Sequence, residues 1–265
     1  MRDGTRICVD LRSNTEFSAY YLGQYDGLLV HTLKSLLDSS NNSIEHKVFL
    51  DVGANIGFYT LAIAQHLRNS GIKTKIYSFE PHPANFARLC ENIELNNLQY
   101  IVESFNFGLS DASRLCDLTL REDFLNGAGT GNASIPTGAA LDEGFPKISI
   151  KLEPLDKILA AANFNMSGID AIKIDIEGHE DYFLRGAVST ICKFRPLIMM
   201  EINKPYYRAR GVNLDKTFLP ILPDRYLIFI RHTTSWRKIV TLESCSEVEN
   251  IFLLPSELAN RMGLG

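Results

Sequence analysis

Residues 48–57 read Val-Phe-Leu-Asp-Val-Gly-Ala-Asn-Ile-Gly, and this stretch decides the fold. An apolar run interrupted by Asp51 leads into a Gly-x-Asn-x-Gly turn, and an amphipathic segment follows from Phe58 to Leu67. The order strand, tight turn, helix presents backbone N–H groups at a helix N-terminus, where a polar or anionic ligand group binds. Asp51 precedes the turn, where its carboxylate could bind a cationic or hydroxyl group of that ligand. The pattern therefore predicts a nucleotide-like ligand at the edge of an α/β sheet.

Strands and helices alternate from residue 47 onward. We expect strands at 47–51, 75–80, 100–109, 169–175 and 197–201, and two late strands near 225–231 and 249–254. Helices are expected at 57–68, after Pro81-His82-Pro83, and from Glu180 to about Lys193. This alternation predicts a mostly parallel sheet with right-handed crossovers, whose ligands bind at the carboxyl ends of the strands.

The remaining segments lie before this pattern and in its middle. The sequence predicts a short strand at 6–11, one or two helices within 15–37, an extended segment at 115–121 and a mobile loop at 126–138. We divide the chain into an N-terminal extension, 1–46, and a catalytic domain, 47–265. The aromatic stretch Tyr20–Tyr25 is expected either to close over the ligand or to pack on the sheet as a helix. The loop from Gly127 to Gly138 is a second candidate lid.

Composition excludes several classes of protein. The 265 residues are 45% hydrophobic and 22% charged, which suits a packed α/β domain. The net charge of −4 and the lack of a dense Lys/Arg block argue against nucleic-acid binding. No apolar run is long enough for a membrane span, and the charged N-terminus is not typical of a signal peptide. We therefore expect a cytoplasmic protein. The five scattered cysteines predict reduced thiols and argue against a zinc cluster or a disulfide framework.

Four acids fall at the expected strand ends: Asp51, Glu80, Asp175 and Glu201. Glu80 follows the glycine turn by a little over 20 residues, the place from which a carboxylate accepts both ribose hydroxyls. Buried carboxylates are costly unless paired, so four acids at one edge point to function. These residues alone leave open a nicotinamide-dependent oxidoreductase, a methyltransferase and a non-catalytic cofactor-binding module.

Three motifs together resemble the FkbM family of S-adenosylmethionine-dependent methyltransferases. They are Asp51-Val-Gly-Ala-Asn-Ile-Gly57, Tyr77-Ser-Phe-Glu-Pro81 and Ala171-Ile-Lys-Ile-Asp-Ile-Glu-Gly-His-Glu180. The resemblance implies a Rossmann-like class I methyltransferase fold. It has a mostly parallel, seven-stranded sheet with helices on both faces, an antiparallel last strand and, in this chain, an N-terminal extension. It also implies S-adenosyl-L-methionine as cofactor and a hydroxyl of a saccharide or natural product as acceptor.

Residue roles follow from the same resemblance. Gly53, Asn55 and Gly57 would hold the methionine part and the ribose, Glu80 the ribose diol, and Gly108 and Leu109 would border the adenine. Asp51 is expected near the methionine end, bonded to its ammonium directly or through water. His179 departs from the family, in which a small residue is common at this position.

An alcohol is a poor nucleophile until its proton leaves, so the site needs a base. The candidates are Asp175, Glu177 and His179; for Glu180 we favour stabilisation of the following helix. A metal-assisted alternative uses Asp175, Glu201 and Asn203 as oxygen ligands for Mg²⁺, which would acidify the hydroxyl.

Overall fold

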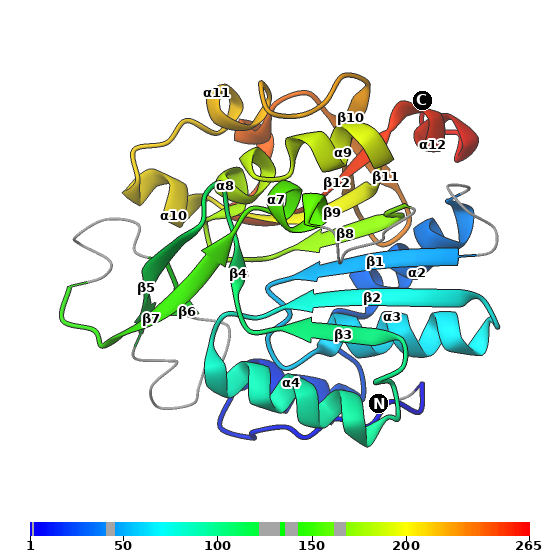
Figure 1. Cartoon of the computed structure of the whole chain (residues 1–265). Coiled ribbons are helices and arrows are strands. Elements are labelled where there is room, and N and C mark those ends of the chain that lie inside the picture. Colours follow the sequence, from blue (N-terminus) through cyan, green and yellow to red (C-terminus); the bar gives the residue numbers. More distant parts are fainter. Residues whose placement is uncertain (2, 41–45, 122–132, 136–142, 162–167) are drawn as a thin grey trace.

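The computed structural model describes residues 1, 3–40, 46–121, 133–135, 143–161 and 168–265. Its main sheet has eight strands in the order β11-β10-β12-β9-β8-β1-β2-β3 (Figure 1). Their bounds are β1 His46–Val52, β2 Lys73–Phe79, β3 Val102–Phe105, β8 Ala171–Ile174, β9 Leu197–Asn203, β10 Tyr226–Arg231, β11 Trp236–Ile239 and β12 Val248–Pro255.

The sheet topology confirms the class I methyltransferase fold. Strands β3, β2, β1, β8 and β9 run parallel, and β12 pairs antiparallel with both β9 and β10. The sheet has eight strands instead of the expected seven because β11, a short edge strand, was not predicted. The carboxyl ends of β1, β2, β8 and β9 therefore meet at one edge.

Helices cover both faces, as expected (Figure 1). One core joins the sheet to α2, α3, α4 and α12, and the other joins it to α7 through α11. The bounds are α1 Asn14–Leu22, α2 Gly27–Ser39, α3 Phe58–Asn69, α4 Pro83–Leu95, α7 Leu155–Ala160, α8 Glu180–Arg185, α9 Val188–Phe194, α10 Lys204–Ala209, α11 Leu214–Phe218 and α12 Ser256–Arg261. The single helix expected up to Lys193 is two helices, α8 and α9.

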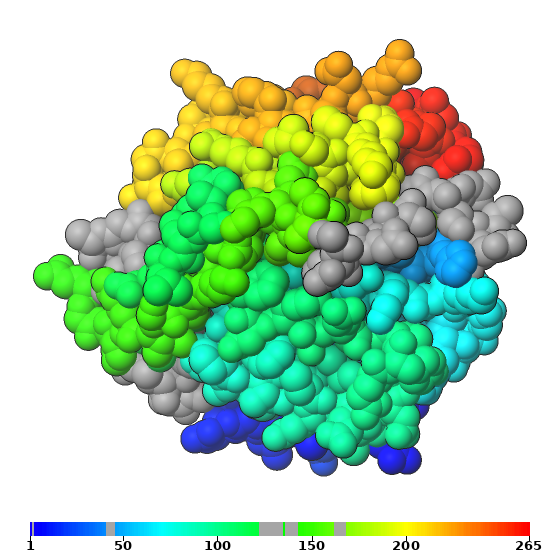
Figure 2. Space-filling model, viewed as in Figure 1, coloured from blue at the N-terminus to red at the C-terminus, as the bar shows by residue number. Residues whose placement is uncertain are grey.

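A second, smaller sheet has the order β4-β7-β5-β6. It consists of β4 Gly108–Leu109, β5 Arg114–Leu120, β6 Ala133–Ser134 and β7 Lys147–Glu153. Strand β5 confirms the extended segment at 115–121, whereas β7 was not predicted despite its alternating Ile148, Ile150 and Leu152. Most of the expected loop 126–138 lies outside the described residues. Figure 2 shows the small sheet (green) at the surface between α4 (teal) and α8–α10 (yellow).

The strand expected at 6–11 is wrong, because this segment is irregular backbone. Its N–H groups bond to side chains of α4 and its C-cap instead of a neighbouring strand: Cys8 N donates to Asn92 Oδ1 in α4 and Arg6 N to Asn96 Oδ1 at the C-cap, each at 2.8 Å. The helices expected within 15–37 are confirmed as α1 and α2. The five cysteines are free thiols. Within the described ranges, we find no helix with the length and apolar character needed to cross a bilayer.

Candidate active site

The glycine turn connects β1 to α3 and lies against the end of β8. Gly53 has φ +78°, and a Cβ atom there would lie 2.0 Å from the carbonyl oxygen of Asp175. Gly57, at φ +100°, is the N-cap of α3 and provides no capping side chain. The close approach that requires Gly53 is therefore between two backbone segments, and the first N–H groups of α3 stay available to an anionic group.

Glu80 follows β2 and lies beside the turn. Its two carboxylate oxygens accept hydrogen bonds from Asn55 N at 2.8 Å and His82 N at 2.9 Å. Burial raises the pKa of Glu80 to about 7. Each oxygen has a second lone pair. Glu80 therefore joins the ends of β1 and β2 and can still accept hydrogen bonds from a ligand.

Asp51 lies within the protein instead of facing the site. Its carboxylate is 0% exposed; Oδ2 accepts from Thr60 Oγ1 at 2.6 Å, and Oδ1 lies 3.5 Å from Lys173 Nζ. Lys173 also donates to Gly53 O at 2.8 Å. Burial alone would lower the pKa of Lys173, but Asp175 and Asp51 outweigh it and raise that pKa. Asp51 thus holds a buried lysine under the turn.

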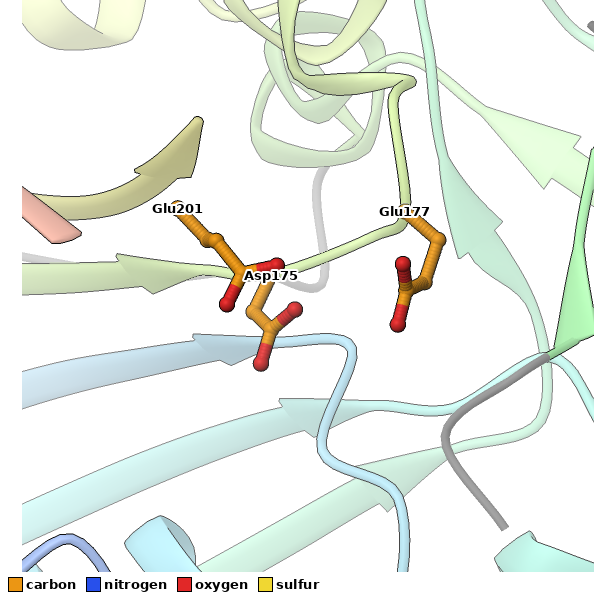
Figure 3. Close-up of side chains that lie close together, drawn as sticks. All are labelled: Asp175, Glu177 and Glu201. Carbon is orange, nitrogen blue, oxygen red and sulfur yellow. The ribbon is translucent and has the colours of Figure 1, made fainter. Parts of the chain in front are cut away.

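Three carboxylates meet at the ends of β8 and β9. Asp175, Glu177 and Glu201 each place an oxygen within 4.8 Å of the others (Figure 3). Asp175 follows β8, Glu177 lies in the next loop with φ +55°, and Glu201 is in β9. A positive φ at a non-glycine residue is uncommon and costs free energy. The backbone therefore holds Glu177 in a strained conformation that brings its side chain to this cluster.

Like charges in a buried setting change the protonation of this cluster. Burial and the neighbouring Asp175 raise the pKa of both Glu177 and Glu201. Tyr206 hydrogen-bonds to Glu177, and its own hydroxyl oxygen accepts from Arg121 Nη1 at 2.8 Å. The cluster can therefore take up a proton near neutral pH, as pairs of interacting carboxylates do.

His179 lies apart from the carboxylates, although it is only two residues from Glu177. Its ring stacks on Tyr182 at 4.5 Å, and its Nε2 lies 2.9 Å from Ser110 Oγ. Burial lowers the pKa of His179 to about 3. His179 lines a separate cavity of about 430 Å³ together with Arg114 and Arg210. It is a neutral, weakly basic side chain in this structure.

Glu180 stabilises the turn before α8. Its Oε1 accepts from Ile176 N at 3.0 Å and Gly178 N at 3.3 Å, and its Oε2 accepts from Tyr207. Burial raises the pKa of Glu180 to about 7. These contacts connect the loop before α8 to α10, whereas the sequence favoured an interaction of Glu180 with the dipole of the following helix, which stays a prediction.

The residues predicted to border adenine lie after β3. Gly108 packs against Leu152 and Pro81, and Leu109 is a buried core residue. Asn106 lies just before them, exposed, and donates to Glu80 O at 2.9 Å. Asn106 is therefore better placed to meet a ligand than the Leu109 side chain.

The metal hypothesis named Asp175, Glu201 and Asn203. The structure brings Glu177 to the first two, while Asn203 lies two residues beyond Glu201 in β9 and forms the N-cap of α10. Three carboxylates fit a divalent cation by ligand type. Lys173 Nζ, 3.5 Å from Asp175 Oδ2, already places one positive charge there.

Sequence reasoning missed the polar partners around these acids. Lys173, Tyr206, Tyr59 and Asp26 were assigned no role. For Lys173 a signal existed: a lysine inside the apolar strand Ala-Ile-Lys-Ile must be paired if both faces of that strand are buried. For the others, only the folded chain shows the contact.

Comparison with known proteins identifies the family. A family model described as "Methyltransferase FkbM domain" matches residues 51–247. "Methyltransferase 1" of Beauveria bassiana is 27% identical over 52% of this chain and 57% of its own length. "Hexuronic acid methyltransferase AglP" of Haloferax volcanii is 28% identical over 60% of this chain and 57% of its own length. The chain thus spans a little over half the length of these relatives.

Solved structures of methyltransferases are also similar to this chain. The FkbM methyltransferase of Methylobacillus flagellatus has 19% identity and a TM-score of 0.46, covering 79% of this chain and 44% of that one. A methyltransferase of Podospora anserina, solved with S-adenosylhomocysteine bound, has 12% identity and a TM-score of 0.46. The match covers 91% of this chain and 79% of that one.

Proposed function

The chain belongs to the FkbM methyltransferase family, and we propose that it transfers the methyl group of S-adenosylmethionine to a hydroxyl of a saccharide or natural-product acceptor. The observation that carries this proposal is the carboxylate cluster of Asp175, Glu177 and Glu201 at the strand ends beside the glycine turn. That edge is where ligands of open α/β sheets bind.

Charge favours S-adenosylmethionine over a nicotinamide cofactor. The described acids near this edge include Asp26, Asp51, Glu80, Asp175, Glu177 and Glu201, whereas Lys173 forms its described ion pairs with Asp51 and Asp175. S-adenosylmethionine carries a sulfonium and an ammonium, which such a site attracts, while the pyrophosphate of a nicotinamide cofactor would be repelled. The free N–H groups of α3 suit the single carboxylate of the methionine part.

The nucleoside would lie across the turn and the end of β2. Gly53, Asn55 and Gly57 supply the backbone that approaches it, and Glu80 accepts the ribose hydroxyls with its remaining lone pairs. When bound, the cofactor supplies an activated methyl group. The protein residues then need only to position the acceptor and remove its proton.

Glu177 and Glu201 are the proposed base. A carboxylate with a raised pKa accepts a proton more readily, and efficient general bases have a pKa close to the working pH. As the acceptor oxygen bonds to the methyl carbon, the carbon–sulfur bond breaks and its electron pair stays on sulfur. The hydroxyl proton passes to the carboxylate pair. Asp175 and Tyr206 orient the pair, and His179, with its depressed pKa, is not used as the base.

A divalent cation at the same carboxylates is the second candidate mechanism. Mg²⁺ bound there would acidify the acceptor hydroxyl directly. We favour proton transfer because Lys173 already neutralises part of the charge at Asp175. Turnover that survives EDTA without loss would support the carboxylate base, whereas turnover that disappears with EDTA and returns with Mg²⁺ would favour the metal.

A sugar acceptor is supported by the name of the Haloferax volcanii relative, which describes a hexuronic acid methyltransferase. The decisive experiment incubates the protein with methyl-labelled S-adenosylmethionine and a panel of glycans and natural products, followed by mass analysis of the products. Label appearing as an ether on a hydroxyl supports the proposal. Binding of NAD(H) in place of S-adenosylhomocysteine would favour an oxidoreductase. Full biological activity of a Glu177→Gln/Glu201→Gln variant would favour a non-catalytic module.

A further inference from the structure

Asp26 joins α1 to α2 in an unusual backbone conformation. It occupies the N-cap position of α2 but has φ +43°, in the left-handed region, and its side chain makes no capping hydrogen bond. An aspartate at an N-cap normally accepts from the first turn of its helix. Here the strained residue turns its carboxylate away from that helix, which is typical of a functional position.

Two tyrosines hold this carboxylate. The Tyr59 hydroxyl donates to Asp26 Oδ2 at 3.0 Å, and Tyr25 also hydrogen-bonds to Asp26. The Tyr25 ring stacks on Phe58 at 4.3 Å and meets Tyr59 edge-on at 5.8 Å. Because Phe58 and Tyr59 form the first turn of α3, Asp26 is fixed beside the helix that the glycine turn begins.

Asp26 also lies close to the charged end of β8. Lys173 Nζ is 5.3 Å from the centre of the Tyr59 ring, whose hydroxyl bonds Asp26. Asp175 and Lys173 both act electrostatically on Asp26. In the part of the chain that the structure describes, the nearby Lys173 forms its ion pairs with Asp51 and Asp175 and not with Asp26. Asp26 is thus a solvent-exposed acid close to the site that can still take a cationic partner from a ligand.

The other acids near the methionine end are already paired. Asp51, the residue expected from the sequence to bind the ammonium, is fully buried against Thr60 and Lys173. Asp175 lies 3.5 Å from Lys173 and belongs to the carboxylate cluster. We propose that Asp26, oriented by Tyr25 and Tyr59, binds the α-ammonium of the methionine part of S-adenosylmethionine.

This assignment rests on the proposed function, and it gives the N-terminal segment a direct part in cofactor binding. The ammonium would be the cationic partner of Asp26, while the methionine carboxylate meets the N–H groups of α3 a short distance away. A hydrogen bond to a charged group contributes about 1.5–3 kcal/mol, so its loss weakens binding by roughly 10- to 150-fold.

The test measures dissociation constants by calorimetry for two ligands. S-adenosylhomocysteine carries the ammonium, and 5′-methylthioadenosine has the same nucleoside and thioether without the amino acid. We expect Asp26→Asn to weaken S-adenosylhomocysteine binding by roughly 10- to 150-fold and to leave 5′-methylthioadenosine binding unchanged. Asn tolerates positive φ, so this change keeps the backbone conformation. Asp38→Asn, an exposed site on α2, is the matched control and should alter neither constant.

The outcomes separate this inference from the function on which it rests. If the wild-type protein binds neither ligand, the proposed function fails. If it binds both and Asp26→Asn changes neither constant, or weakens both equally, the assignment of Asp26 is overturned. Tyr59→Phe provides a second check that leaves the charge in place. Tyr59→Phe should weaken only the binding of S-adenosylhomocysteine, and by a smaller factor than Asp26→Asn does. If the Tyr59→Phe variant binds this ligand as tightly as wild type, the orienting role of Tyr59 is contradicted.

Discussion

Lys173 and Asp51 are register partners on the adjacent parallel strands β8 and β1, with Nζ 3.5 Å from Oδ1. Both side chains are almost fully buried, and Lys173 also donates to the carbonyl of Gly53 at 2.8 Å. One ion pair therefore links the two central strands and the glycine turn. It fixes the floor of the site and needs both partners, because either charge alone would be buried without compensation.

Removing the lysine tests this arrangement. Lys173→Met keeps the length and apolar stem of the side chain but leaves Asp51 buried and unpaired, so we expect a loss of about 3–5 kcal/mol in the free energy of unfolding. Urea denaturation measures it. The double variant Lys173→Met/Asp51→Asn removes both charges and should recover part of the loss. No recovery would show that the lysine acts mainly through Gly53 and not through Asp51.

The carboxylate pair makes a kinetic prediction. Glu177→Gln and Glu201→Gln each remove a proton acceptor, so kcat for the acceptor found in the labelled-methyl screen should fall by roughly 10²- to 10⁴-fold. The dissociation constant for S-adenosylhomocysteine should stay within a factor of a few. Glu249→Gln, on β12 outside the cluster, is the control. Unchanged kcat in both cluster variants would remove these glutamates from the mechanism.

The sequence was sufficient for the sheet and for the edge that carries the site. Strands that alternate with helices predict a parallel sheet. In a parallel sheet the strand ends that carry Glu80, Asp175 and Glu201 lie at one edge. The segment 6–11 shows the limit. Its alternating Ile7 and Val9 are typical of a strand, but its N–H groups bond to Asn92 in α4 and to the C-cap residue Asn96, more than 80 residues away in the sequence.

The direction in which each side chain points could also not be predicted from the sequence. Asp51 and Asp175 both end strands, yet Thr60 and Lys173 draw Asp51 into the core. His179 is near Glu177 in sequence, but its ring nitrogen contacts Ser110, the residue that follows β4. Asp26 reaches the site through Tyr59, a contact between residues 33 positions apart. These outcomes depend on packing between distant segments, which local patterns do not encode.

Glu80 makes binding depend on pH. Its pKa is raised to about 7 by burial, and only the ionised carboxylate is a full acceptor for two ribose hydroxyls. We expect the affinity for S-adenosylhomocysteine to rise as the pH increases through about 7. Glu80→Gln should weaken binding by roughly 10- to 100-fold at pH 8 and flatten this dependence. Glu103→Gln, exposed on β3, should behave as wild type. A pH dependence that persists in Glu80→Gln would assign it to another group.

Glu180 makes the stability of the fold depend on pH. Its folded-state pKa of about 7 lies above the ordinary value of 4.5, so the folded protein binds this proton more tightly than the unfolded chain. Its stabilising contribution is therefore fully present below pH 4.5 and is lost as the pH rises through about 7. Glu180→Gln stays uncharged and can still bond Tyr207 and the N–H of Ile176. The free energy of unfolding of the variant relative to wild type should therefore increase between pH 5 and pH 8, by up to about 3 kcal/mol.

Urea unfolding at several pH values measures this difference between Glu180→Gln and wild type. The control Glu94→Gln, at an exposed site on α4, should show no change of this difference with pH. Glu80 titrates in both proteins and cancels from the comparison, so a constant difference across the range would mean that Glu180 is ionised in the folded state throughout.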